Sequence, residues 1–203
     1  SFIIAMSTTV ISIVLGSLAA YGLAIMKYNW GNRISTFLLF SKLVPTITIM
    51  IPLYIILDKV HLLGTYVGPI LAHVSVNAPF VAWLVLGFIR DIPGDLFEAG
   101  KLDGCTRMQV FWKIVFPLLS PAIGSALLLV MQYSWNELLF SMQYTNLHTY
   151  TLTVGVSRFV GAISVDWGQS SAAATIVMVP IIIAGFFLQK YLVSGLTAGA
   201  VKG

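Results

Sequence analysis

Long apolar runs, separated by short polar stretches, dominate this sequence. Five runs contain few or no charged residues over a length that can cross a hydrocarbon core, which takes about 20 helical residues. The first two cover residues 2–26 and 34–57. The third begins near Tyr66 and lies between Lys59 and Arg90, and the last two lie between residues 113 and 137 and between residues 166 and 190. Each run is continuously apolar and lacks the period-two alternation of barrel strands. The pattern therefore predicts five transmembrane helices.

The composition excludes an ordinary soluble domain. Of the 203 residues, 58% are hydrophobic and 9% are charged, more apolar surface than a globule of this size can bury. The net charge of +4 does not indicate nucleic acid binding, because the basic residues are scattered singly without a basic stripe. The one cysteine, Cys105, excludes an internal disulfide and a cysteine-cluster metal site, and we expect a small buried thiol.

Loop charges predict the orientation in the membrane. If the loop after the first helix is cytoplasmic, only Lys59 and Arg158 lie outside, and Lys42 is a membrane-embedded or snorkelling residue. Because the sequence starts at Ser1 within an apolar run, we expect a fragment of a longer protein with six spans, one of them upstream. The C-terminus is then cytoplasmic. Eight basic residues lie on the inside in this orientation: Lys27, Arg33, Arg90, Lys101, Arg107, Lys113, Lys190 and Lys202.

Prolines interrupt three of the predicted spans, at Pro45, Pro52, Pro69, Pro79 and Pro180. Kinked helices are tolerated where they pack on protein or line a cavity, so this pattern favours a transporter over a simple anchor. The longest predicted outer loop covers residues 141–168. Its aromatic residues are expected either to anchor the chain at the membrane interface or to form a surface for an external partner.

A polar group lies near the end of the fourth predicted span. Tyr133, Asn136 and Glu137 have the helical spacing i, i+3 and i+4, so they share one face. An aromatic ring beside amide and carboxylate groups suits a polyhydroxylated solute, and these residues are candidates for the solute path. Alternatively, Glu137 marks the membrane boundary and Asn136 cross-links helices. Asn77, in the third predicted span, is a further candidate.

Motifs of catalysis were not found in the sequence. It contains no Walker A loop, no HExxH and no GxSxG pattern. The three histidines, His61, His73 and His148, are isolated, and we expect each of them to be a structural residue.

The one extended polar stretch follows the third predicted span. It carries two capping-box patterns, Asp95 to Glu98 and Thr106 to Gln109, each of which predicts a helix start. Gly104 is placed where the first of these helices should stop. The pattern predicts two short helices at a bend outside the lipid.

This stretch resembles the EAA motif of the membrane-spanning subunits of bacterial ABC importers: Glu-Ala-Ala, three residues, Gly, nine residues, Ile-x-Leu-Pro. Glu98 and Ala99 match, Gly100 replaces the second alanine, and Gly104 has the required spacing. The sequence 114–117 closes the motif with phenylalanine in place of leucine. The tail 192–203 is similar to the end of the maltose-type carbohydrate permease subunits related to MalG, and that similarity extends over nearly the whole chain.

The resemblance implies an all-α integral membrane protein, a polytopic helical bundle of the type I ABC importer permease kind. Residues 1–203 would form a single transmembrane domain in the bacterial inner membrane, with a cytoplasmic coupling segment at 91–117. The chain would carry a carbohydrate, in particular an oligosaccharide, and would not be an enzyme itself. It would bind no cofactor, because ATP and Mg are used by two partner ATPase subunits. A homologous second permease and an extracytoplasmic solute-binding protein complete the assembly, without nucleic acid.

In that family the motif docks on the ATPase subunit and transmits its closure to the spans. Small residues at the motif permit close approach, and a glutamate offers a carboxylate to a basic partner. Other hypotheses are the same architecture importing a non-sugar solute, a secondary carrier, or a membrane enzyme. A carrier usually shows internal repeats and buried ionisable residues. The residues implied in coupling are Glu98, Ala99, Gly100, Asp103, Gly104, Ile114 and Pro117.

Overall fold

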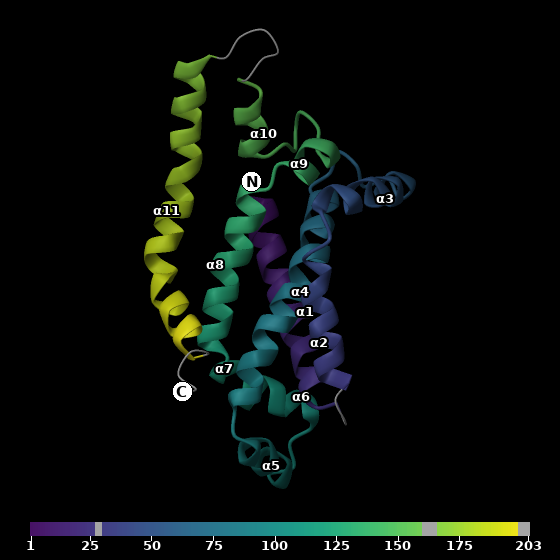
Figure 1. Cartoon of the computed structure of the whole chain (residues 1–203), viewed down its shortest axis with the longest axis vertical. Helices are drawn as coiled ribbons and strands as arrows, with labels where there is room; N and C mark the ends of the chain where they lie inside the picture. The colour runs from purple at the N-terminus through teal and green to yellow at the C-terminus, as the bar shows by residue number, and fades with distance from the viewer. Residues whose placement is uncertain (27–29, 160–165, 199–203) are drawn as a thin grey trace. The chain divides into compact units, whose positions relative to one another are not determined.

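The computed structural model describes residues 1–26, 30–159 and 166–198. Throughout these ranges the regular structure is helical, which confirms the predicted all-α fold (Figure 1). Lys27 and Lys202, used above to predict the orientation, and residues 199–203 of the tail lie outside the described residues. The helices are α1 Phe2–Ala24, α2 Trp30–Ser41, α3 Thr46–Lys59, α4 Val67–Asp91, α5 Gly94–Leu102, α6 Arg107–Val110, the π-helix η1 Phe111–Val115, α7 Phe116–Leu118, α8 Ser120–Asn136, α9 Leu139–Tyr144, α10 Leu152–Ser157 and α11 Trp167–Ala198.

Three helices in the described ranges are long and apolar enough to cross a membrane: α1, α4 and the part of α11 from Trp167 to Phe187. Two bent pairs of helices also qualify, α2 with α3 and the segment Arg107–Leu118 with α8. Counting each bent pair as one span gives up to five, which agrees with the number predicted from the sequence.

The second predicted span, residues 34–57, is not one kinked helix. Helix α2 ends at Ser41, and α3 begins at Thr46 with Pro45 as its N-cap residue. Proline has no backbone N–H, and it disfavours the helical conformation at the residue before it, so the chain breaks here. Pro52, by contrast, lies inside α3, which continues through it.

The fourth predicted span and the outer loop also differ from expectation. Before α8 the chain forms α6, η1 and α7, and this segment is bent by 76° from α8, which begins only at Ser120. A π-helix marks a local departure from regular helical hydrogen bonding and accommodates such a change of direction. The predicted outer loop contains two short helices, α9 and α10.

The chain divides into two compact units, and α1, α4, α8 and α11 contribute residues to both. Unit 1 comprises residues 1–10, 44–75 and 128–188. In it, the Tyr144 hydroxyl donates to the Met50 carbonyl at 2.6 Å and ties α9 to α3. Burial raises the pKa of Tyr144 to about 12, so the hydroxyl remains protonated at neutral pH. The Trp135 indole donates to the Val177 carbonyl at 3.1 Å and links α8 to α11.

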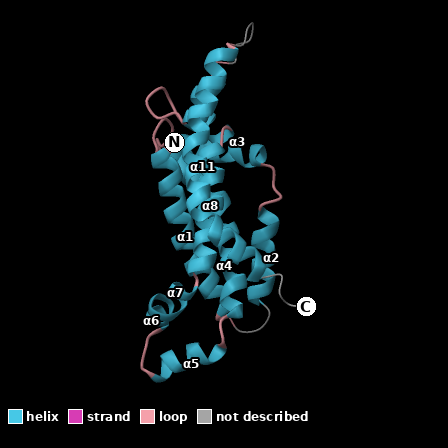
Figure 2. Cartoon of the chain, turned by 90° about the vertical axis from the view of Figure 1, so that its left-hand side faces the viewer, coloured by secondary structure: helices cyan, strands magenta, loops and turns pink. Residues whose placement is uncertain are grey.

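Unit 2 comprises residues 11–43, 76–127 and 189–203. Its α1 and α4 segments approach closely at Gly16, where an added Cβ would lie 2.6 Å from the side chain of Val81. Helices α5 and α6 lie at one end of this unit (Figure 2). There the Tyr21 hydroxyl of α1 donates to the Arg107 carbonyl at 3.0 Å, which joins α6 to the end of α1.

Candidate functional site

Helix α5 begins one turn after α4 ends, with Pro93 as its N-cap residue and no side-chain cap. The predicted capping box from Asp95 to Glu98 is therefore wrong. The helix starts earlier than this pattern indicated because Pro93 is its N-cap residue, with a φ of −55°, which the proline ring fixes, and a ψ of 133°, outside the helical range. Asp95 lies in the first turn instead, where a carboxylate interacts favourably with the helix dipole.

The turn after α5 confirms the role predicted for Gly104. Its φ of 77° is in the left-handed region that favours glycine. The N–H of Gly104 donates to the Lys101 carbonyl at 3.0 Å, and the N–H of Cys105 donates to the Gly100 carbonyl at 3.0 Å. This pair of bonds is the Schellman pattern that ends an α-helix.

Helix α6 begins with the capping box predicted at Thr106. The Thr106 hydroxyl accepts from the backbone N–H of Gln109 at 3.3 Å, and the Gln109 side chain accepts from the backbone N–H of Thr106 at 2.8 Å. The predicted form of this segment, two short helices joined at a bend, is thus confirmed.

One face of α5 packs on η1 through two of the predicted coupling residues, Gly100 and Ile114. Gly100 is buried, and a Cβ added to it would lie 2.7 Å from Cδ1 of Ile114 and 3.1 Å from Cγ2 of Val110. A larger residue at this position would require the side chain of Ile114 to move. The other side of the segment faces outward, since five of the predicted coupling residues are exposed: Glu98, Ala99, Asp103, Gly104 and Pro117.

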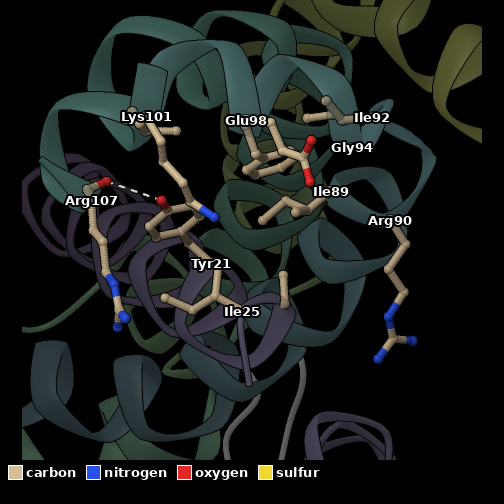
Figure 3. Close-up of a pocket in the computed structure, with 12 residues that line it drawn as sticks. Tyr21, Ile25, Ile89, Arg90, Ile92, Gly94, Glu98, Lys101 and Arg107 are labelled. Carbon is tan, nitrogen blue, oxygen red and sulfur yellow. Dashed lines mark hydrogen bonds between the residues drawn. The ribbon is translucent and has the colours of Figure 1, made fainter. Parts of the chain in front are cut away.

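A cavity of about 470 Å³ lies beside α5, between the ends of α1 and α4 and the start of α6 (Figure 3). Glu98 and Lys101 line it from α5, and Arg107, Arg90 and Tyr21 line it from the neighbouring helices. In Figure 3, Arg90 and Arg107 lie on opposite sides of Tyr21. The contact of Tyr21 with α6 was not predicted from the sequence, because nothing in the local pattern pairs the two.

The predicted solute-path residues of α8 come together at a second cavity, in unit 1. This open groove of about 390 Å³ is lined by Leu129, Gln132, Tyr133, Asn136 and Glu137. Tyr133 is half-buried and Asn136 is exposed. Glu137 is only 8% exposed. The aromatic ring and the amide thus remain accessible, whereas the carboxylate points into the protein.

The Glu137 carboxylate takes part in a buried hydrogen-bond network. His73 Nε2 lies 3.0 Å from Glu137 Oε2, and His73 Nδ1 lies 2.7 Å from Ser134 Oγ. The backbone N–H groups of Phe140 and Ser141 donate to the same carboxylate at 2.8 and 3.0 Å. The prediction that His73 is structural agrees with these contacts. Its partner lies 64 positions away, so no sequence signal linked the two.

Asn77, the other candidate for the solute path, belongs to unit 2. It is 1% exposed, and its side-chain oxygen accepts from Lys42 Nζ at 3.4 Å. The Lys42 ammonium also lies 5.0 Å from the centre of the Phe80 ring, within range of a cation–π interaction. Lys42 is therefore held against α4 by the protein.

Comparison with known proteins identifies related sequences along nearly the whole chain. Residues 12–198 match the family model described as "Binding-protein-dependent transport system inner membrane component". The trehalose transport system permease protein SugB of Mycobacterium tuberculosis is 34% identical, over 98% of this chain and 74% of its own length. The trehalose/maltose transport system permease protein MalG of Thermococcus litoralis is 34% identical, over 100% of this chain and 74% of its own. The arabinooligosaccharides transport system permease protein AraQ of Bacillus subtilis is 30% identical, over 100% and 72%.

Solved structures support the fold. A chain of a bacterial ABC transporter that imports the acidic polysaccharide alginate superposes with a TM-score of 0.67 at 22% identity, covering 94% of this chain and 75% of that one. A chain of the MetNI methionine ABC transporter gives a TM-score of 0.66 at 17% identity, covering 95% and 93%. These transporters carry different solutes on the same fold, so the fold alone does not determine the solute.

Proposed function

This chain belongs to the family of binding-protein-dependent transport system inner membrane components, and from that premise we propose that it forms half of the translocation path of an ATP-driven carbohydrate importer. The relatives at 30–34% identity carry trehalose, maltose or arabinooligosaccharides by name. The groove of α8 adds a chemical argument, because Tyr133 offers a ring face and Asn136 an amide, the two kinds of contact that a sugar uses. An oligosaccharide is the favoured solute.

We further propose that α5 and α6 face the cytoplasm. Among the described residues, the basic ones predicted to lie inside and those predicted to lie outside fall in different units. Lys59 and Arg158 belong to unit 1. Unit 2 contains Arg33, Arg90, Lys101, Arg107 and Lys113. This grouping supports the positive-inside argument, with the coupling segment at the cytoplasmic end.

The α5–Gly104–α6 segment is proposed to dock on an ATPase subunit. Its exposed side carries Glu98 and Asp103, and Leu102 between them is 88% exposed, an apolar side chain suited to burial in a partner's cleft. The complete assembly would contain a second permease, two ATPase subunits that use ATP and Mg, and an external solute-binding protein. The close packing of Gly100 on Ile114 would carry movement of α5 into η1 and on towards α8.

The coupling role is tested by reversing one charge on this surface. Glu98→Lys should reduce ATP-dependent uptake to background while the protein still inserts and assembles, because the carboxylate meets its partner only at the dock. Asp58→Lys is the matched control, since Asp58 is also exposed but lies in α3, in unit 1. Uptake at the parental rate by Glu98→Lys would contradict the assignment of this surface.

The solute path is tested by truncating the groove. Tyr133→Ala and Asn136→Ala should change solute preference or solute-stimulated ATPase activity in the reconstituted transporter. Gln143→Ala removes an exposed polar side chain of α9 that does not line the groove, and it should behave as the parent. Unchanged rates and preference in both groove variants would remove them from the solute path.

A non-sugar solute is a second candidate, favoured by one relative. The osmoprotective compounds uptake permease protein GgtD of Synechocystis is 33% identical over 100% of this chain and 68% of its own length. A thermal-shift screen of the cognate binding protein against oligosaccharides, polyols and osmoprotectants distinguishes the two, because its ligand defines the solute. Transport without nucleotide or a bound ATPase would instead indicate a secondary carrier.

A further inference from the structure

We propose that His73 and Glu137 form a positioning pair that holds the corner between α8 and α9 and thereby sets the shape of the groove beside Tyr133 and Asn136. The inference rests on the proposed function only where it takes the groove to be part of the solute path. His73 is fully buried and acts through its neighbours, without contact to the solute, whereas Glu137 also lines the groove.

The pair joins α4 to the end of α8. His73 is fully buried, and its two ring nitrogens contact Ser134 Oγ at 2.7 Å and Glu137 Oε2 at 3.0 Å. One tautomer satisfies both contacts: the Ser134 hydroxyl donates to Nδ1, and the Nε2–H donates to the carboxylate. A single imidazole thus holds the last turn of α8 and the residue that follows it.

The other contacts of Glu137 form the start of α9. Glu137 Oε1 accepts from the N–H of Phe140, and Oε2 accepts from the N–H and the hydroxyl of Ser141. N–H groups in a helix's first turn have no acceptor within the helix, and a negative charge there is favourable. The carboxylate therefore supplies acceptors that the backbone lacks, and both of its oxygens are engaged inside the protein.

The corner is also held from the far end of α9. The carbonyl of Tyr144 accepts from the N–H of Gly64 at 2.8 Å, in the loop before α4. On the groove side, the His73 ring meets the Tyr133 ring edge-on, with centroids 6.1 Å apart. His73 thus contacts the Tyr133 ring of the groove directly, and it holds Glu137, the residue that follows Asn136. Loss of the imidazole should move both groove side chains.

The order serine–histidine–carboxylate also occurs in hydrolytic triads. Here Ser134 is 1% exposed and His73 is 0% exposed. A substrate carbonyl cannot reach the Ser134 oxygen in this arrangement, so the three residues hold structure and do not cleave bonds.

The test measures the groove directly with a thiol reporter in the assembled transporter. The native cysteine is removed by Cys105→Ser, and Asn136→Cys is labelled with a water-soluble maleimide. Adding His73→Ala should change the labelling rate by about threefold or more, because two buried hydrogen bonds are lost. His73→Gln, which retains a donor for the carboxylate, should restore the rate to within about twofold of the parent.

Trp135→Phe is the matched control. It removes a partly buried hydrogen bond of α8 to Val177, in the same unit, without touching the groove lining. A labelling change as large as that of His73→Ala would mean that any loss of packing moves the reporter, and it would overturn the proposal. An unchanged rate in His73→Ala would overturn it as well.

Two further outcomes separate this proposal from the proposed function. If Tyr133→Ala and Asn136→Ala leave solute preference unchanged while His73→Ala alters labelling, the positioning pair stands and the solute path is assigned wrongly. If His73→Ala does not assemble, Ser134→Ala decides, because it removes only the partner of Nδ1. A rate change of about twofold or more in that variant supports the pair, and an unchanged rate contradicts it.

Discussion

At the scale of single residues, Gly104 forms the turn that ends α5 before α6 begins. Its φ of 77° is the left-handed conformation, and a Cβ added there would meet nothing within 4 Å. The cost of any other residue therefore comes from the backbone alone, about 1–2 kcal/mol for an L-residue. Because the same turn sets the orientation of α5, we expect this conformational cost to weaken the coupling between the ATPase subunit and the membrane spans.

We predict that ATP-dependent uptake falls strongly in Gly104→Val and much less in Gly104→Asn. Valine is β-branched and avoids positive φ, whereas asparagine tolerates it. Uptake is measured per assembled transporter in proteoliposomes. Gly94→Ala serves as the control, since Gly94 also has open space around its Cβ position but no positive φ. Equal uptake by the valine and asparagine variants would mean that backbone conformation at 104 does not limit coupling.

Local signals explain which residues could be predicted from the sequence. The Gly104 turn and the Thr106 cap depend on residues a few positions apart, so the sequence contains the whole signal. Asp95 was misassigned because Pro93 offered an alternative start two residues earlier. The pairing of His73 with Glu137 could not be predicted, because it depends on how α4 packs against α8.

At the scale of helices, α1 packs closely on α4 in unit 2. An added Cβ at Gly16 would lie 2.6 Å from Val81 Cβ and 3.0 Å from the Ala78 carbonyl oxygen. Neither of these atoms is the far end of a flexible side chain, so the helices would have to separate. Small residues of this kind let helices approach closely in membranes.

Gly16→Ala should therefore destabilise the protein by about 1–3 kcal/mol, the usual cost of overpacking. Gly22→Ala, in the same helix, meets nothing within 4 Å and should be neutral or slightly stabilising. The measurement is the midpoint of thermal unfolding in detergent. Adding Val81→Ala should recover part of the loss, and a double variant no better than Gly16→Ala would argue against this contact as the cause.

The cap of α6 gives a prediction at the same scale. Thr106→Ala removes one half of the capping box, which should weaken α6 by about 0.5–2 kcal/mol. Amide hydrogen exchange at Met108 to Val110 should then become faster. Asp95→Ala should accelerate exchange in α5 less, because the Asp95 side chain does not cap that helix and only its interaction with the helix dipole is lost. Comparable acceleration in both helices would contradict the distinction between them.

Hydropathy predicts the length of an apolar segment better than its shape. Residues 34–57 and 113–137 are apolar enough to span a membrane, yet each breaks into more than one helix. At Pro45 the missing N–H gives a local reason for the break. At Ser120 the bend follows the π-helix η1, whose aromatic residues pack on one another. The ring centroid of Phe111 in η1 lies 5.1 Å from that of Tyr21, and no local sequence pattern predicts such a contact.

At the scale of the whole molecule, the apolar pattern and the spacing of one motif were sufficient to predict the membrane fold and the family. Both are properties of many positions, so single departures such as Gly100 for alanine do not remove the signal. The solute is different, because transporters that carry different solutes share this fold. The groove at Tyr133 and Asn136 could be located, but its occupant depends on chemistry beyond this chain.

Orientation is the prediction that involves the whole molecule, and the native cysteine tests it. Cys105 is half-buried in the turn between α5 and α6, the segment proposed to be cytoplasmic. A membrane-impermeant maleimide should label it in inverted membrane vesicles and not in right-side-out vesicles. Labelling after detergent solubilisation in both preparations shows that the thiol itself is reactive.

The reciprocal variant completes the test of orientation. In a Cys105→Ser background, Leu147→Cys places a thiol in the loop between α9 and α10, where Leu147 is 69% exposed. It should be labelled in right-side-out vesicles and protected in inverted ones, because positive residues are concentrated on the opposite side. If both thiols react from the same side, the chain does not cross the membrane an odd number of times between them. If the two patterns are exchanged, α5 and α6 face outward and cannot meet a cytoplasmic ATPase.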